Sequence, residues 1–88
     1  MNLNALIKNI EEASGISSLS QVTKFEGYLE GIGMVEVSVG DRGEGDNLRY
    51  SVWARTMDEV PERLAAGNPG PDLETTIALV HWQDLKNK

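Results

Sequence analysis

Hydrophobic and polar residues alternate in two stretches of the chain, at residues 34–39 and 48–55. A period of two sends successive side chains to opposite faces of a β-strand, so each stretch predicts a strand with one apolar face. The alternating residues of the first stretch are Val35, Glu36, Val37, Ser38 and Val39. The predicted apolar face of the second carries Leu48, Tyr50, Val52 and Ala54.

The opposite face of the second stretch carries Arg49, Trp53 and Arg55. The centres of protein interfaces are enriched in Trp and Arg, so this face is a candidate contact surface. In a second interpretation, Glu36 and the arginine stems cover Trp53, and a cation–π contact forms with no ligand present. The sequence leaves both interpretations open.

The N-terminal segment has helical periodicity instead. Its apolar positions predict a helix over residues 3–14. Asn2 or Asn4 is suited to cap the start of this helix, and Gly15 is suited to end it. The apolar positions are Leu3, Leu6, Ile7 and Ile10.

Residues 19–33 fit either a helix or a strand, because their apolar positions also approximate a helical stripe. Gly27, Gly31 and Gly33 disfavour a helix interior and suit a turn and a bulge, which favours a strand over residues 22–30. Residues 40–47 form a polar loop with three glycines. We therefore expect an antiparallel meander of three strands.

Two further helices are predicted after the meander, over residues 58–66 and 71–86. The glycines and prolines of residues 67–71 separate them. Trp82 and Leu85 project away from the widest apolar side of the last helix. They either close the edge of the core or meet a second subunit or another partner.

These elements define one α+β domain over residues 1–88: a helix, a three-stranded antiparallel meander and two helices packed on one face of the sheet. The chain has 14 acidic and 8 basic residues and a formal charge of -6. Such a charge opposes direct binding to nucleic acid or anionic lipid. No apolar run is long enough to span a bilayer, the N-terminus lacks a signal-peptide pattern, and cysteine is absent, so we expect a cytoplasmic protein.

Candidate chemistry is sparse. His81 has neither a second histidine nor a cysteine to share a metal ion, so no metal site and no cofactor are expected. The acidic residues of the polar loop miss the spacing of a calcium loop, and its glycines lead into no helix. A single histidine without a nucleophile signature leaves an enzyme as the weaker class.

The opening segment Met1–Ile10 resembles, in its Asn, Leu and Ile placement, the first helix of an anti-CRISPR protein. The expected order of elements is also shared by double-stranded-RNA-binding-like folds and by small phage proteins. Anti-CRISPR proteins of this group block type II-A effector nucleases. The resemblance implies a phage or mobile-element inhibitor, and it carries over no site residues.

We therefore expect a small non-enzymatic protein that occupies a basic surface on a protein partner such as a nucleic-acid-handling effector. Trp53 and Arg55 are the expected anchors, with Arg49 beside them. The expected charge complements are Asp41, Glu44 and Asp46. The alternative is a structural subunit or homodimer that self-associates through Trp82 and Leu85.

Overall fold

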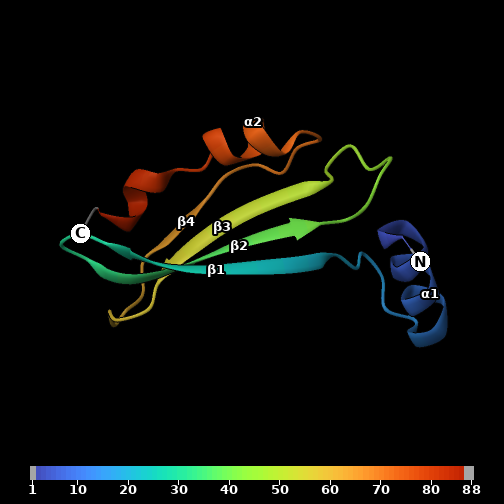
Figure 1. Cartoon of the computed structure of the whole chain (residues 1–88), viewed down its shortest axis with the longest axis horizontal. Coiled ribbons are helices and arrows are strands. Elements are labelled where there is room, and N and C mark those ends of the chain that lie inside the picture. The colour runs from blue at the N-terminus through green and yellow to red at the C-terminus, as the bar shows by residue number, and fades with distance from the viewer. Residues whose placement is uncertain (1, 87–88) are drawn as a thin grey trace.

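Four antiparallel strands and three short helical segments make up the computed structural model, which describes residues 2–86 (Figure 1). The strands are hydrogen-bonded in the order β1-β2-β3-β4. The α+β class and the antiparallel sheet are thereby confirmed, while the sheet has one strand more than expected. The elements are α1 (Leu3–Ser14), β1 (Gln21–Leu29), β2 (Gly33–Asp41), β3 (Tyr50–Thr56), β4 (Leu64–Ala66), α2 (Leu73–Ala78) and the 3-10 helix η1 (Trp82–Leu85).

The register of the strands fixes two faces. Phe25 lies opposite Val37, and Val37 lies opposite Ala54, so these three side chains share one face. The residues between them, including Glu36 and Trp53, point to the other face. The predicted alternation is the one that the sheet uses in β2 and, from Tyr50 onward, in β3, whereas Leu48 and Arg49 precede β3 and Leu48 is exposed. Residues 21–29 are a strand rather than a helix.

The core lies between one face of the sheet and the C-terminal segment. Val52 and Ala54 of β3 are 2% and 1% exposed. They pack with residues from β2, β4, η1 and the turn before η1, whereas β1 contributes only a partly buried Leu29. The buried cluster is Val35, Val52, Ala54, Ala65, Val80 and Leu85. The helical segments thus cover β3 and β4 and leave much of β1 exposed.

The prediction of a helix over residues 58–66 is wrong, because this segment ends in the strand β4. The spacing of Thr56 and Glu59 resembles a capping box, but these side chains make other bonds. The Thr56 hydroxyl accepts a hydrogen bond from the Arg63 amide at 2.8 Å, and Glu59 binds the Arg63 guanidinium at 2.7 Å. Both bonds close the connection from β3, after which Ala65 pairs opposite Ala54.

The single helix predicted over residues 71–86 is divided in the structure. Asp72 caps α2, and the chain turns after Ala78 before η1 begins. The His81 amide donates to the Ala66 carbonyl at 3.1 Å, which ties the turn to the end of β4. Gly67 permits this approach, because a Cβ atom there would lie 2.7 Å from the Leu79 carbonyl oxygen. Through the turn, both α2 and η1 reach the core.

Helix α1 has the predicted bounds but does not cover the sheet. The Asn2 side chain caps it by accepting from the Ala5 amide at 2.8 Å, and Gly15 ends it with φ of 77°. Figure 1 shows α1 beyond one end of the strands, beside the loop between β2 and β3. Its one buried residue is Ile7. Only the C-terminal segment therefore fits the expectation that helices cover one face of the sheet.

We predict that the Val52→Ala substitution lowers the free energy of unfolding by about 2 kcal/mol, because two methyl groups leave a well-packed site. The matched substitution Leu6→Ala removes a side chain of α1 that is 43% exposed, and it should change stability by less than about 0.5 kcal/mol. Urea unfolding of both variants measures the difference. Equal losses would show that α1 belongs to the same core.

Candidate functional site

One face of the sheet carries no helix among residues 2–86, and we call it the open face. It is the face of Glu36 and Trp53, opposite to the cluster that packs under α2 and η1. Two aromatic side chains stand on it: Tyr28 is 73% exposed and Trp53 is 36% exposed. The residues that the register places on the open face are Val22, Lys24, Glu26, Tyr28, Met34, Glu36, Ser38, Gly40, Ser51, Trp53, Arg55, Leu64 and Ala66.

Trp53 is fixed by its neighbours on β2. A Cβ atom at Gly40 would lie 3.4 Å from the indole ring, so the ring passes over this glycine at van der Waals distance. Ser38, which is opposite Trp53 in the register, is 2% exposed. The backbone of β2 thus supports one side of the ring and leaves the remainder to solvent. A Trp held in this way loses little conformational entropy when it binds a partner.

A chain of ion pairs crosses the open face from β1 to the segment before β4. Glu36 binds Arg55 at 3.1 Å and Lys24 at 3.7 Å. Arg55 also binds Glu62 at 3.2 Å. The hydrogen bond from Arg55 holds the pKa of Glu36 below its ordinary value of 4.5, and Lys24 acts in the same direction. The hydrogen bond to Glu36 in turn raises the pKa of Arg55.

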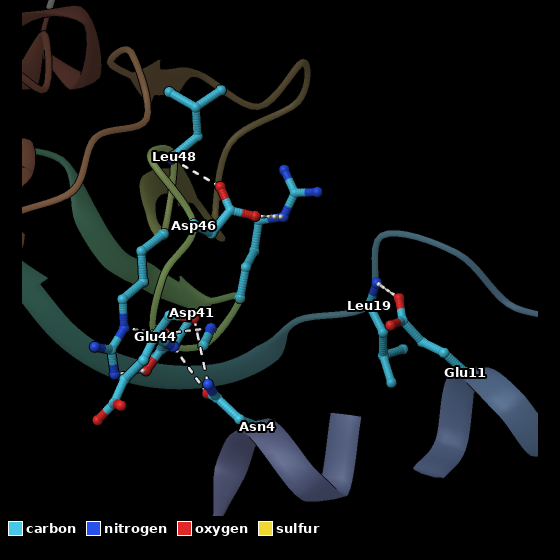
Figure 2. Close-up of polar contacts among 10 residues, drawn as sticks. Asn4, Glu11, Leu19, Asp41, Glu44, Asp46 and Leu48 are labelled. Atoms are coloured by element: carbon cyan, nitrogen blue, oxygen red, sulfur yellow. Dashed lines mark hydrogen bonds and ion pairs between the residues drawn. The ribbon is translucent and has the colours of Figure 1, made fainter. Parts of the chain in front are cut away.

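The loop between β2 and β3 is organised by its own carboxylates (Figure 2). Arg49 donates two hydrogen bonds to Asp41, at 2.8 and 3.1 Å, and its guanidinium lies 4.8 Å from the centre of the Tyr50 ring. The Arg49 hydrogen bond lowers the pKa of Asp41, and the Gly43 amide contributes to the shift. Arg49 precedes β3, and its guanidinium is bound to Asp41. It therefore does not stand beside Trp53 on the open face.

The two remaining carboxylates predicted as charge complements, Asp46 and Glu44, differ in whether they are already paired within the chain. Asp46 accepts from the Leu48 amide at 2.8 Å and pairs with Arg42 at 3.4 Å. Glu44 is exposed, and its backbone is fixed by the Asn4 side chain, which accepts from the Glu44 amide at 2.8 Å (Figure 2). Of the three predicted charge complements, Asp41 and Asp46 are therefore already paired within the chain.

The C-terminal residues predicted for self-association lie against the sheet of their own chain. Leu85 is 4% exposed and belongs to the core cluster. Trp82 packs beside it, and its indole N–H donates to the Ile77 carbonyl at 3.0 Å. Both placements agree with the interpretation in which this segment closes the core. Self-association through these residues stays a prediction.

A second feature, an apolar groove beside β1, was not predicted from the sequence. Its volume is about 240 Å³, and it lies where the helical cover ends. Its apolar lining includes Phe25, Leu29, Val35, Val37 and Leu85. The alternation of Phe25, Gly27 and Leu29 is the signal that places them on the core face of β1. The alternation alone does not show whether these side chains are covered, because their cover depends on how far α2 extends over the sheet.

The described part of the chain shows neither a cluster of metal-binding side chains nor a helix that could span a membrane. Between residues 2 and 86, no three His, Cys, Asp or Glu side chains are grouped so that they could hold a metal ion. In the same range, no helix has the length and apolar character needed to cross a membrane.

Comparison with known proteins gives no relative. No model of a protein family, no curated protein and no solved structure matches the chain. The resemblance of Met1–Ile10 to an anti-CRISPR helix therefore rests on those ten residues alone. The chemistry of the open face is the remaining guide to function.

We predict that Glu36→Gln removes part of the acid sensitivity of folding. Because the folded-state pKa of Glu36 is lowered, its ion pairs stabilise the native state above pH 4.5, and this stabilisation is lost as the pH falls through the folded-state pKa. The variant should be less stable than the wild type at pH 7 and should lose less stability on acidification. Thermal unfolding between pH 7 and pH 3 measures both effects.

The matched control is Glu12→Gln, which removes an exposed carboxylate on α1. Its unfolding curve should follow that of the wild type at each pH. If the Glu36→Gln and wild-type curves run parallel, Glu36 does not contribute to the pH dependence.

Proposed function

We propose that this protein is a small non-enzymatic binding domain that occupies a basic surface on a protein partner. The observation that carries the proposal is the pairing of every arginine with a carboxylate of the same chain. The pairs are Arg42 with Asp46, Arg49 with Asp41, Arg55 with Glu36 and Glu62, and Arg63 with Glu59. The chain thus neutralises its own guanidinium groups.

The consequence of this pairing is an outward acidic excess. The net charge is -6, and the arginines that would offset it locally are already engaged. Exposed carboxylates remain at several places around the molecule. They include Glu26 on the open face and Glu44 in the loop between β2 and β3. A surface of this kind attracts a basic partner and repels phosphate.

The open face supplies the contact itself. Trp53 offers a supported aromatic ring, Tyr28 a more exposed one, and Arg55 lies beside Trp53 with its charge satisfied by Glu36 and Glu62. Aromatic anchors surrounded by satisfied charges are typical of the energetic centre of an interface. The structure thus supports Trp53 and Arg55, and gives less support to Arg49, Asp41 and Asp46, as contact residues.

The class of partner follows from charge. Proteins that handle nucleic acids carry basic channels or stripes, which are the surfaces that an acidic domain fits. We propose that binding blocks such a surface sterically and electrostatically, as an inhibitor or modulator of a nucleic-acid-handling effector. The burial of Leu85 gives no support to the alternative of self-association through the C-terminal segment.

We predict that the double substitution Trp53→Ala with Arg55→Ala raises the Kd for the partner at least tenfold, since it removes both anchors (about 1.4 kcal/mol or more). The partner is first captured from host lysate on the immobilised wild-type protein and identified by mass spectrometry. The purified partner is then titrated against both forms of the domain at low and moderate salt. Binding should weaken as salt rises.

The matched control is Leu79→Ala with Lys86→Ala, two exposed residues of the C-terminal segment on the helical side of the sheet. It should bind the partner like the wild type. Unchanged affinity of the Trp53 and Arg55 variant, with its fold verified by circular dichroism, would reject the open face as the contact. An affinity that does not depend on salt would reject the electrostatic mechanism.

A further inference from the structure

Within residues 2–86, no strand pairs with the outer side of β1, which is therefore a free edge of the sheet. It pairs with β2 on one side, and all its residues except Leu29 are exposed. It is nine residues long and contains no proline. The other edge, β4, has three residues and lies between Pro61 and Pro69. Short strands and prolines protect an edge against pairing, and β1 lacks both protections.

We propose that β1 pairs antiparallel with β1 of a second copy, with the two Phe25 residues opposite each other at a two-fold axis. Each four-stranded sheet would then continue into the other. Identical edges that meet in this way use the same residues on both sides, as a two-fold interface requires. The pairing would satisfy the outward amide and carbonyl groups of β1 with roughly eight to ten backbone hydrogen bonds.

Charge selects this register over its neighbours. In an antiparallel pair, the outward N–H and C=O groups belong to every second residue of β1, so even-numbered residues must meet even-numbered ones and odd-numbered residues odd-numbered ones. A two-fold axis between two β1 strands therefore passes through a residue, and the axes near the middle of the strand lie at Lys24, Phe25 or Glu26. With Lys24 on the axis, two ammonium groups would be opposed, and with Glu26 there, two carboxylates. With Phe25 on the axis, Lys24 of each copy lies opposite Glu26 of the other. Opposite charges across a strand pair stabilise it, and like charges destabilise it.

Strand length favours the same register. Phe25 is the central residue of Gln21–Leu29, so this pairing matches all nine residues of one strand with nine of the other. It also places Val22 opposite Tyr28 on the open face, where they are 42% and 73% exposed. Pairs of an aromatic and a β-branched residue are among the favourable combinations across antiparallel strands.

The apolar groove points to the same arrangement. Phe25 lies on its rim and is 57% exposed, although it shares the core face with Val37. Residues directly opposite each other in a strand pair share a face, so the two grooves would join and each Phe25 ring would cover the other. The dimer thus covers the apolar surface that α2 and η1 leave exposed.

This inference does not rest on the proposed function. Trp53 lies on β3, two strands away from the free edge, so the open faces of both copies would remain accessible. A dimer would therefore present two copies of the same contact surface. Failure of either proposal leaves the other standing.

Sedimentation velocity over a range of protein concentrations tests the dimer. The wild type should shift from monomer to dimer as concentration rises. Glu26→Lys should weaken the association about tenfold or more, because Lys24 of each copy then faces the introduced lysine of the other. The introduced lysine lies opposite Glu36 in the register, so we expect the variant to keep its fold. Glu12→Lys on α1 changes the net charge equally and should dimerise like the wild type.

A charge exchange makes the test specific. Lys24→Glu and Glu26→Lys should each dimerise weakly alone, form a heterodimer when mixed, and dimerise again when combined in one chain. Thermal unfolding of dilute samples verifies that each monomer is folded. A wild type that stays monomeric at every concentration would overturn the proposal and leave β1 free for an extended segment of another protein. Equal dimerisation of all variants would overturn the assigned edge.

Single cysteines test the register, since the chain has none of its own. Under mild oxidation, Phe25→Cys should form a disulfide-linked dimer, because opposed residues across an antiparallel pair lie within disulfide reach. Tyr28→Cys should crosslink far less, because Tyr28 faces Val22 in this register. Preferential crosslinking through position 28 would overturn the axis at Phe25.

Discussion

The packing of Val80 and Leu85 against Val52 and Ala54 is the contact on which the rest of the structure depends. It brings the C-terminal segment onto β3 and β4, and this segment supplies the apolar cover for the sheet. Because α1 lies beyond the end of the strands, only the short C-terminal segment is left to cover the four-stranded sheet, and it reaches β3 and β4. The open face and the exposed edge of β1 are both consequences of a core that is small and lies at one side.

The parts of the fold that local periodicity dictates could be predicted from the sequence. The apolar spacing and capping residues of α1 and the alternation in β2 and β3 act within each segment. Residues 58–66 were mispredicted because Thr56 and Glu59 have the spacing of a capping box, whereas in the structure Thr56 bonds Arg63 through its backbone and hydroxyl and Ala65 pairs with Ala54 of β3. The break before η1 likewise depends on the hydrogen bond between His81 and Ala66, which joins segments distant in sequence.

The candidate site shows the same division. Alternation correctly places Trp53 and Arg55 on the face opposite the core. It fails for Arg49, because β3 begins at Tyr50 and the guanidinium before it is held by Asp41. Alternation also does not predict the exposure of Phe25, because that exposure depends on how far α2 and η1 extend over the sheet. Periodicity assigns a side chain to a face, whereas cover depends on segments remote in sequence.

Glu36 connects the two proposed surfaces. Its carboxylate joins Arg55 beside Trp53 to Lys24 on the free edge, so the charges of the open face continue to β1. Lys24 has three N–H donors and a side chain that is 60% exposed, which leaves room for a carboxylate from a second copy. Pairing at the edge therefore need not break the ion pairs that flank Trp53. The same acidic excess that favours a basic partner opposes the approach of two copies, and the match of Lys24 with Glu26 provides a local attraction against it.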